Sequence, residues 1–446
     1  MSKSGVSRDK EFVLRTVQDN NITFIRLWFT DILGTLKSFT ITSDELKNTL
    51  EEGFGFDGSS VTGFHAIEES DTLAMPVPET FNILPWDSGD LTECRMFCNV
   101  LEPTGEPFKG DPRYILKQNL EEAKKMGFEM LVGPELEYFY FKNTEGTELL
   151  DRGGYFDLGA LDQGELLRKK TVLALNRLGI KVECSHHEVA PSQHEIDLRY
   201  APALKMADWA QTYKKVVKKV AQDNGVSATF MPKPIYGENG SGMHTHQSLF
   251  TNGRNAFYDS DSEYHLSETG RYYLAGLLKH ARAITAICNP TVNSYKRLVP
   301  GYEAPVYVAW SQKNRSALVR LPDYKPGKEN AVRLEFRSPD PACNPYLAFS
   351  VMLAAGLDGI RQQYELETPV TENIYTMLKG HERHIPGMTM LPGSLEEALN
   401  EMQESSLLKH CLGEHVFTRF VELKRLEWHE FIQTVTPYEM EHYLTL

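Results

Sequence analysis

The hydrophobic pattern of the N-terminal part predicts short elements of both kinds. Residues 8–20 (RDKEFVLRTVQDN) have helical spacing, and between residues 21 and 41 two β-rich runs flank DILG, as in a hairpin. Ser43 is suited to cap a further helix, which Gly53 ends. A long stretch rich in Gly, Pro, Ser and Asp follows to about Pro107, and irregular loops of that length are usually functional. We therefore expect a small mixed α+β domain with a long irregular segment.

Longer alternating elements follow from Asp111 onward. Asp111-Pro112 has the form of an N-cap followed by Pro in the first turn, so we place a domain boundary here, with domains over 1–108 and 109–446. Hydrophobic spacing then predicts strands at 130–141, 181–188, 193–200, 240–250 and 332–340, and helices at 112–127, 164–179, 206–225, 267–288, 345–363 and beyond 394.

Composition narrows the class of protein. The chain has 446 residues, of which 41% are hydrophobic and 24% charged, as in an ordinary globular enzyme. Its formal net charge of −14 argues against nucleic acid as a partner. The six cysteines are scattered without a C-x-x-C pair, and no segment resembles a signal peptide or a membrane span. We expect a cytoplasmic protein with no membrane partner.

The glycine-rich motifs of the sequence give little support to a dinucleotide-binding fold or a P-loop. Gly53, Gly55 and Gly58 match G-x-G-x-x-G, but the match follows a predicted helix and opens a loop, the reverse of a dinucleotide-binding turn. The sequence contains no G-x-x-x-x-G-K-[ST]. If the protein uses ATP, metals and arginines must hold the phosphates.

Two carboxylates two residues apart, Glu135 and Glu137, form the most informative feature of the chain. They lie in the predicted strand MLVGPELEYFYF, where residues i and i+2 point to the same face. Adjacent carboxylates on an apolar strand are costly unless cations compensate them. The pair therefore predicts a divalent metal site.

The same spacing recurs in other strands. His244 and His246 lie in GSGMHTHQS, and Glu335 has an arginine two residues away on either side. Glu188 and Glu195 flank a Pro-containing turn. Singly, such a Glu is most often exposed and such a His structural, but together five carboxylates and a histidine suit Mg²⁺ or Mn²⁺. Two such ions would clamp a phosphoryl transfer.

Three arginines and one loop carboxylate are further candidates. Arg297, Arg315 and Arg320 could bind carboxylate or phosphate oxygens, although a salt bridge to the chain's own acidic residues is the more common role of a single arginine. Glu303 lies in PGYEAP, a loop that could close over a substrate and supply a base; alone it would be a solvated loop residue.

Seven motifs in order, FDGSS, GPELEYF, HHEVAPSQHE, NGSGMHTHQS, KRLVPGYEAP, NRSALVRLP and RLEFRSPDPACNPYLAF, resemble glutamine synthetase of the bacterial and archaeal type I class. The resemblance runs from about residue 12 to the C-terminus. It implies an α+β fold, with a small β-grasp-like N-terminal domain and a large C-terminal catalytic α/β domain whose antiparallel sheet forms the active-site funnel.

The resemblance implies two metal sites and several substrate subsites. One metal would be held by Glu137, Glu188 and Glu195, and the second by Glu135, His244 and Glu335. The implied ATP-binding residues are Glu183, His246, Ser248, Arg315 and Arg320, and the implied glutamate-binding residues are Glu137, Asn239, Gly240, Arg297, Glu303 and Arg337. The ammonium pocket would contain Asp57, Tyr155 and Glu188, with Asp57 reaching across from a neighbouring subunit. Asp57, Glu303 and Arg315 would be catalytic.

The implied reaction has two steps. The γ-carboxylate of L-glutamate attacks the ATP γ-phosphate, and ammonia then displaces phosphate from γ-glutamyl phosphate to give L-glutamine. The family implies Mg²⁺ (or Mn²⁺), two or three ions per active site, with ATP as a substrate. It also implies a dodecamer of two hexameric rings, allosteric regulation and small regulatory proteins as further partners.

Two departures from the family pattern concern regulation. Short members usually have an arginine where this chain has Ala66, so we expect weak inhibition by glutamine. Tyr375 lies near the site of adenylylation in longer members, but the surrounding sequence differs, and we do not expect it to be modified. Two rival functions stay open: a γ-glutamyl-amine ligase of the same fold, and a regulatory binding protein that retains the fold.

Overall fold

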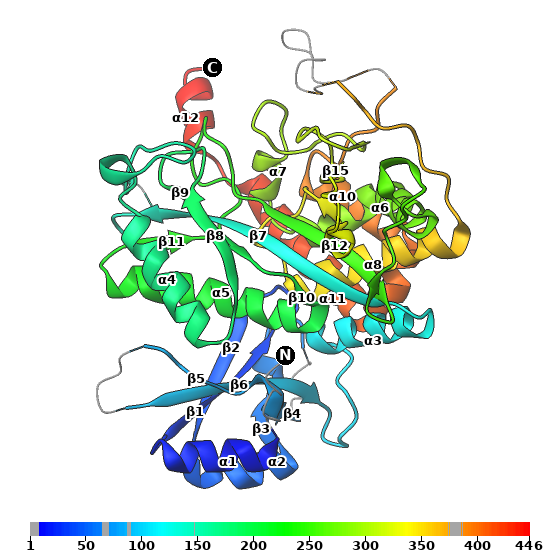
Figure 1. Cartoon of the computed structure of the whole chain (residues 1–446). Coiled ribbons are helices and arrows are strands. Elements are labelled where there is room, and N and C mark those ends of the chain that lie inside the picture. Colours follow the sequence, from blue (N-terminus) through cyan, green and yellow to red (C-terminus); the bar gives the residue numbers. More distant parts are fainter. Residues whose placement is uncertain are drawn as a thin grey trace.

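The computed structural model describes residues 9–64, 71–86, 91–146, 148–372, 374, 385 and 387–446. In Figure 1 a small N-terminal part, drawn in blue, lies below a larger body that contains a long twisted sheet with helices packed against it.

The N-terminal part is a six-stranded sheet in the order β2-β1-β6-β4-β3, with β5 paired to β6. The predicted hairpin is confirmed, because Thr30 pairs with Leu36 across an antiparallel turn, while β1 and β6 run parallel. The strands are β1 (Phe24–Thr30), β2 (Leu36–Thr42), β3 (Phe54–Asp57), β4 (Asp71–Pro76), β5 (Asn82–Ile83) and β6 (Glu93–Leu101), accompanied by helices α1 (Lys10–Asp19) and α2 (Leu46–Glu52).

The prediction of an irregular segment from Gly53 to about Pro107 is wrong, since β3, β4, β5 and β6 all lie within these residues. Strand β6 occupies the middle of the sheet, between β1 and β4, and is buried along most of its length. A central strand covered on both faces has no alternation of polar and apolar residues. The cysteines and Arg95 in ECRMFCNVL obscured it further.

The larger body is built on a ten-stranded sheet in the order β14-β15-β16-β12-β7-β9-β8, with β10 and β11 paired to β7 and β13 to β12. Except for β14 and β15, the paired strands run antiparallel. The strands are β7 (Glu129–Phe141), β8 (Val182–His187), β9 (Gln193–Leu198), β10 (Ala201–Pro202), β11 (Ser227–Thr229), β12 (Met243–Thr251), β13 (Arg254–Asn255), β14 (Trp310–Ser311), β15 (Val319–Arg320) and β16 (Leu334–Phe336).

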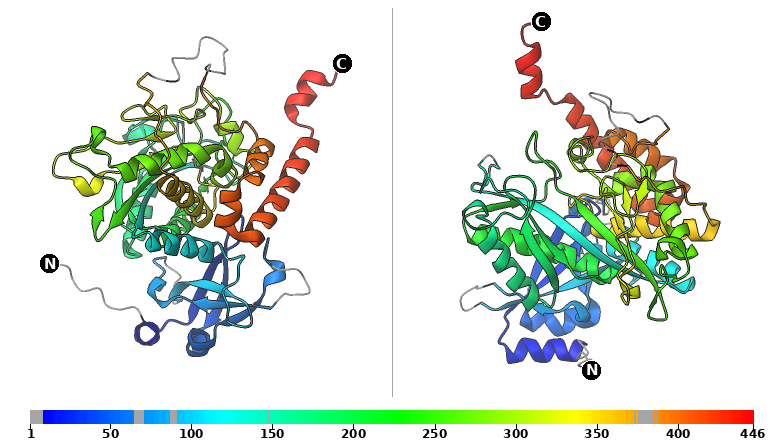
Figure 2. Two further views of the ribbon diagram at one scale, coloured as in Figure 1. Left: turned by 90° about the vertical axis from the view of Figure 1, so that its right-hand side faces the viewer. Right: turned by 45° about the horizontal axis from the view of Figure 1, so that its top comes forward.

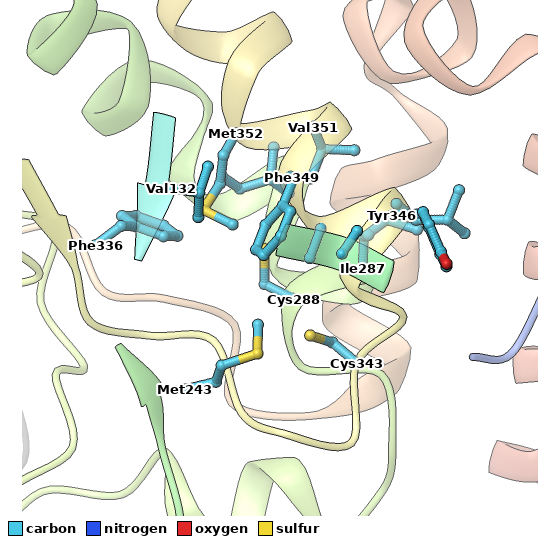
Figure 3. Close-up of a cluster of buried hydrophobic side chains, with 14 of the residues drawn as sticks. Val132, Met243, Ile287, Cys288, Phe336, Cys343, Tyr346, Phe349, Val351 and Met352 are labelled. Atoms are coloured by element: carbon cyan, nitrogen blue, oxygen red, sulfur yellow. The ribbon is translucent and has the colours of Figure 1, made fainter. Parts of the chain in front are cut away.

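Helices cover this sheet and form most of the core. They are α3 (Pro112–Lys125), α4 (Glu165–Arg177), α5 (Ala203–Asp223), α6 (Glu268–Cys288), α7 (Ser294–Arg297), α8 (Pro345–Gln362), α10 (Leu395–Gln403), α11 (Ser406–Gln433) and α12 (Pro437–Tyr443). Helix α8 is apolar and buried over most of its circumference, which marks a helix inside a core. Figure 3 shows Phe349 and Met352 of α8 beside Val132 of β7 and Phe336 of β16.

Glycines allow α6 and α8 to pack closely. A Cβ at Gly276 would lie 2.2 Å from the carbonyl oxygen of Ala355, and one at Gly359 would lie 2.1 Å from that of Tyr272. Since no side chain fits at those distances, the two helices approach at backbone contact. This packing holds the helical layer rigidly behind the sheet that carries the polar strands.

The C-terminal end of the chain extends away from the body, whereas the first part of α11 is buried in it. Figure 2 shows α12 projecting at the end of α11, and α12 contains no buried residue. Among the described residues, none of the helices combines the length and the hydrophobicity that crossing a bilayer requires.

Candidate active site and metal centre

Strand register brings the candidate metal ligands together. Glu135 of β7 pairs with His244 of β12, and His246 pairs with Glu335 of β16. On the other edge of β7, Glu137 pairs with Glu195 of β9. Glu188 follows β8 directly, at the turn into β9. Because side chains on paired strands face the same side, the sheet gathers these groups at one place.

These residues line one cavity of about 540 Å³, which has a polar lining. It contains all six candidate metal ligands, Glu135, Glu137, Glu188, Glu195, His244 and Glu335. It also contains most of the predicted substrate residues, Tyr155, Asn239, Gly240, Arg297, Glu303, Arg315, Arg320 and Arg337. Sequence segments that lie far apart along the chain therefore converge on a single pocket.

Histidines and arginines surround Glu135 and Glu335. Nε2 of His246 lies 2.6 Å from Glu135 Oε1, and Nδ1 of His244 lies 3.3 Å from Glu135 Oε2. Burial opposes the charge of Glu335, but His246, Arg337 and His244 lower its pKa to about 2. Burial likewise acts against ionisation of Glu135, yet His246 and His244 hold its pKa well below the ordinary value. Both carboxylates are therefore charged.

Two arginines form ion pairs with Glu335, one with each carboxylate oxygen. Nη1 of Arg337 lies 2.5 Å from Oε1, and Nη2 of Arg320 lies 2.5 Å from Oε2. Glu335 is only 1% exposed, so these ion pairs are shielded from solvent. Since a guanidinium engaged in this way has a fixed orientation, the two arginines are held at the cavity wall.

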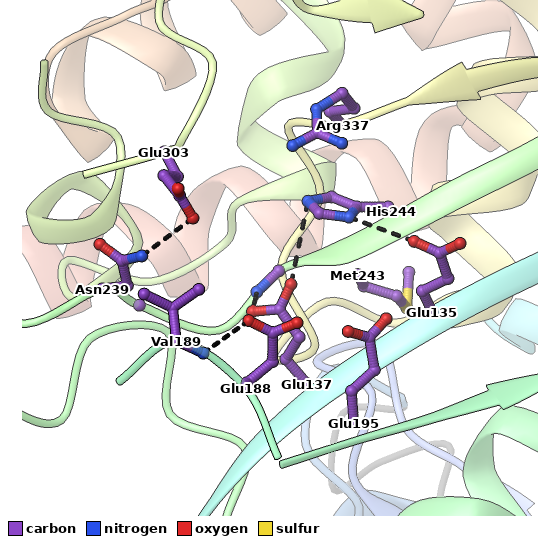
Figure 4. A network of polar contacts seen from close by, with 12 residues as sticks. Glu135, Glu137, Glu188, Val189, Glu195, Asn239, Met243, His244, Glu303 and Arg337 are labelled. Atoms are coloured by element: carbon purple, nitrogen blue, oxygen red, sulfur yellow. Dashed lines mark hydrogen bonds and ion pairs between the residues drawn. The ribbon is translucent and has the colours of Figure 1, made fainter. Parts of the chain in front are cut away.

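The other half of the cavity has excess negative charge. Burial and the neighbouring Glu188 raise the pKa of Glu137 to about 8, and burial together with Asp197 and Glu137 raises the pKa of Glu195 well above its usual range. Glu137 Oε2 accepts hydrogen bonds from Gln193 Nε2 at 2.8 Å and from the Gly242 amide at 2.9 Å. Figure 4 shows Glu137, Glu188 and Glu195 grouped below His244.

The donor set fits divalent cations. His244 Nδ1 lies 3.3 Å from Glu135 Oε2 and 3.9 Å from Glu335 Oε1. Among the described residues, Glu135, His246 and Glu335 also offer ligand atoms within 4.8 Å of one another, and so do His186, Glu188 and Glu195. Carboxylate oxygens with few imidazoles suit Mg²⁺ or Mn²⁺. A cation here would also relieve the repulsion that raises the pKa of Glu137.

Sequence reasoning missed three residues of this region. His186 Nε2 lies 3.0 Å from Glu188 Oε1 and 3.4 Å from Glu195 Oε2. Cys184 and Asp197 also line the cavity. The i, i+2 spacing of Cys184, His186 and Glu188, and of Glu195 and Asp197, carries the same signal that identified Glu135 and Glu137.

Glu303 and Asn239 both line the cavity and are hydrogen-bonded to each other. Asn239 Nδ2 donates to Glu303 Oε2 at 3.0 Å, as Figure 4 shows. Glu303 has φ = 54°, a left-handed conformation that is uncommon for a residue other than glycine. Strained backbone of this kind concentrates at functional sites. On the floor, a Cβ at Gly240 would lie 2.3 Å from the Pro232 carbonyl oxygen, so only glycine fits there.

A second cavity of about 290 Å³ adjoins the first and contains the predicted nucleotide residues Glu183, His246 and Ser248. Glu135, Cys184 and Asp197 line both cavities, which are therefore contiguous. Arg333 also lines the second cavity and donates from Nε to His246 Nδ1 at 3.1 Å.

A buried network supports the turn that carries Glu188. His187 Nδ1 donates to the Glu188 carbonyl at 2.7 Å, and its Nε2 lies 2.8 Å from Asp151 Oδ1. Asp151 also accepts hydrogen bonds from the amides of Ser192 and Gln163. Burial opposes protonation of His187, but Asp151 raises the pKa of this imidazole. Asp151 thereby joins both ends of the 152–162 loop, which carries Tyr155, to the metal-ligand turn.

Asp57 does not reach this cavity within one chain. It is exposed at the end of β3, and its carboxylate accepts hydrogen bonds from Ser59 and Ser60, which lower its pKa. Ala66 and Tyr375 lie outside the described residues.

Known protein families and solved structures match this chain over most of its length. The family "Glutamine synthetase, catalytic domain" matches residues 109–443, and "Glutamine synthetase, beta-Grasp domain" matches residues 21–103. A solved chain titled "GmaS/ADP complex-Conformation 1" superposes with a TM-score of 0.90 at 32% identity, covering 99% of this chain and 100% of that one. A glutamine synthetase of Plasmodium falciparum superposes with a TM-score of 0.88 at 26% identity, covering 99% and 100%.

Curated relatives are closer in sequence. Glutamine synthetases of Methanosarcina mazei and Thermotoga maritima are 50% and 51% identical, covering 98% of this chain and 98% and 99% of their own lengths. Fold and relatives together define an enzyme of the glutamate–ammonia ligase class. The chain belongs to the glutamine synthetase family, and the predicted fold class, a β-grasp domain with a larger catalytic domain, is confirmed.

Proposed function

We propose that this protein makes L-glutamine from L-glutamate, ammonium and ATP through γ-glutamyl phosphate, with the residues of the 540 Å³ cavity in the roles given below. The observation that carries the assignment is the convergence of Glu135, Glu137, Glu188, Glu195, His244 and Glu335 on one pocket beside arginines. A relative that had lost catalysis would be expected to lose some of these groups.

Two divalent cations fit the two halves of the cavity. Glu137, Glu188 and Glu195 would hold one, and Glu135, His244 and Glu335 the other, with Mg²⁺ or Mn²⁺ as the ion and a third ion possible with the nucleotide. Bound cations would neutralise the charge of the migrating phosphoryl group.

The arginines divide between phosphate and glutamate. Arg315 and Arg320 would contact the phosphoryl group, and Arg320 is already oriented by Glu335. Arg337, held by the same carboxylate, and Arg297 would face the substrate glutamate together with Asn239 and Gly240. Glu183, His246 and Ser248 would bind the nucleotide from the adjoining cavity.

The second step requires a shielded acyl phosphate. Glu303 would close over the intermediate and take a proton from the attacking nitrogen, since it lines the cavity and is exposed on a loop. Asp57, Tyr155 and Glu188 would bind ammonium, whose charge the carboxylates attract. Because Asp57 is exposed and does not line the cavity of its own chain, we assign it to the site of a neighbouring subunit.

This shared site requires an oligomer, and we propose the dodecamer of two hexameric rings. The projecting C-terminal segment supports it, since Val435, Tyr438 and Leu444 are 67%, 60% and 70% exposed in the single chain. Apolar groups exposed this far are typical of an interaction surface. We place the domains at 1–108 and 109–446. We assign the protein to the cytoplasm because all six cysteines are free, as is usual in a reducing compartment.

Phosphate release from ATP in the presence of Mg²⁺ and glutamate tests the function, with ammonium or putrescine as the amine. We expect release with ammonium and little with putrescine. Release dependent on putrescine would establish the amine-ligase rival, and no release with either would leave a binding protein of this fold.

A further inference from the structure

The strand pairing of β8 with β9 gathers a thiol, an imidazole and a carboxylate to which the ligation reaction proposed above assigns no role. Cys184 and His186 are two residues apart on β8, and Cys184 pairs with Asp197 on β9. Their ligand atoms all lie within 4.8 Å of one another. From this group we infer a separate site for a thiophilic cation of the Zn²⁺ class.

The contacts of the group leave ligand atoms available. Cys184 Sγ lies 2.6 Å from Asp197 Oδ2. Among the described residues, the buried atoms His186 Nδ1 and Asp197 Oδ1 have no hydrogen-bond partner. Buried polar atoms are normally paired, so two orphaned atoms beside one thiol indicate a missing cation or water. His186 Nε2 meanwhile contacts Glu188, so we assign Nδ1 as the nitrogen that would bind the cation.

The donor types favour zinc over magnesium. Zinc binds Cys sulfur at about 2.3 Å and His nitrogen or carboxylate oxygen at about 2.1 Å, which separates neighbouring ligand atoms by about 3.5 Å. Magnesium prefers oxygen, whereas a thiolate selects softer ions. Three protein ligands with an open fourth position suit a site that a solvent-borne ion can enter and leave. On binding, the Cys184 thiol releases its proton to solvent.

A cation bound to Cys184, His186 and Asp197 would affect turnover because of where these residues lie. Cys184 and Asp197 line both the 540 Å³ and the 290 Å³ cavities, so the cation would lie where the metal centre meets the nucleotide subsite. It would also engage the imidazole that contacts Glu188 and Glu195. Zn²⁺ bound here would therefore inhibit turnover; this consequence rests on the proposed ligase function, whereas the binding itself does not.

Cys184 is also the exposed member of the six cysteines, since Cys94, Cys98, Cys288, Cys343 and Cys411 are buried. A thiolate signal from an added cation can therefore be assigned to one position. Co²⁺ is a suitable probe, because thiolate ligation gives it an intense charge-transfer absorption in the near ultraviolet that oxygen and nitrogen ligands do not produce.

The test is titration of the full-length protein with Co²⁺ in the presence of excess Mg²⁺. We expect a saturable thiolate band that Zn²⁺ displaces, that Cys184→Ser and Cys184→Ala abolish, and that Asp197→Asn shifts to roughly tenfold higher Co²⁺ concentration or more. A matched control combines Cys184→Ser with Ser185→Cys, which moves the thiol one position along β8 to the opposite face; no band should form. A wild type without the band, or a band that persists in Cys184→Ser, would overturn the site.

Inhibition is measured separately by phosphate release. Zn²⁺ should inhibit the wild type at concentrations at least tenfold below those that inhibit Cys184→Ser, with the inhibition of each protein expressed relative to its own turnover in Mg²⁺ alone. Equal sensitivity to Zn²⁺ would refute the inhibitory role. A protein with no ligase activity would leave the Co²⁺ band intact and so would count against the proposed function alone.

Discussion

Glu137 lies directly opposite Glu195 across the β7–β9 ladder, so that two carboxylates, 7% and 5% exposed, face each other on one side of the sheet. Like charges at paired positions destabilise a sheet, and burial adds to the cost. The pKa of Glu137 accordingly rises to about 8, and that of Glu195 also rises. A bound cation would stabilise both groups in their ionised form.

This pairing predicts proton release on metal binding. Because metal ligands must be deprotonated, Mg²⁺ binding at pH 7 should displace the proton that Glu137 holds below a pKa of about 8. Affinity should therefore rise with pH up to about 8 and then level off. Calorimetric titration in buffers of different ionisation enthalpy measures the release, and Glu137→Gln should reduce it. Mg²⁺ affinity independent of pH between 6 and 8 would contradict the assignment.

The exposed position of Asp57 predicts complementation between inactive subunits. Asp57→Ala and Glu335→Ala should each abolish synthesis, because one removes the ammonium carboxylate and the other a metal ligand. When the two variants are co-expressed and assemble together, some sites combine an intact β3 from one subunit with an intact metal centre from another. Recovery of a fraction of wild-type turnover is expected; mixed oligomers that stay inactive would place Asp57 in its own chain's site or outside the mechanism.

Glu303 should affect chemistry without affecting binding. Glu303→Ala removes the carboxylate that accepts from Asn239, and loss of a general base typically lowers turnover by about 100-fold or more. The affinities for Mg²⁺ and ATP should be unchanged, since Glu303 is not among the residues assigned to them. Rates of glutamine formation and equilibrium nucleotide binding distinguish the two effects. Glu303→Gln serves as the control of equal size, and unchanged turnover in either variant would remove Glu303 from the mechanism.

Asp111 predicts a pH-dependent stability that is separate from catalysis. Burial raises the pKa of Asp111 to about 6, although its side chain caps α3 by accepting from the Arg113 amide. A raised carboxyl pKa means that the folded state holds the proton more tightly, so this contribution to stability is complete below the ordinary pKa of 3.8 and is lost as pH rises through about 6.

Between pH 4 and pH 7 this loss is about 2 kcal/mol. Denaturant unfolding of the wild type and of Asp111→Asn at both pH values measures the contribution of Asp111 to the free energy of unfolding. The variant lacks the titrating carboxyl group, and the rest of its chain is unchanged. The wild type should lose about 2 kcal/mol more than Asp111→Asn across this range. Parallel pH profiles would show that Asp111 titrates normally.

The sequence allowed prediction that the candidate metal ligands share a strand face, because that signal is local. Spacing of two residues on a strand puts Glu135 beside Glu137 and His244 beside His246 on one face, whatever the strands pair with. The pairing itself is non-local, so the register that sets Glu135 against His244 was not predictable from periodicity. The same limitation applies to Arg320 and Arg337, whose common partner Glu335 became evident only in the folded chain.

Two features of the fold are not predictable from the sequence pattern. The pattern predicts an irregular segment in place of strand β6, because a buried central strand lacks polar alternation. Cys184, His186 and Asp197 come together only through the non-local pairing of β8 with β9, which their spacing along the chain does not reveal. Asp57 does not line the cavity of its own chain, because it lies at the exposed end of β3 in the N-terminal sheet, and its assignment to a neighbouring subunit's site stays a prediction.

The central claim is that carboxylates and an imidazole from separate strands hold a pair of divalent cations. Anomalous scattering from a crystal of the protein soaked in Mn²⁺ and ATP tests it most directly. The account predicts one peak among Glu137, Glu188 and Glu195 and another among Glu135, His244 and Glu335. Mn²⁺ bound only elsewhere, with these side chains uncoordinated, would contradict it.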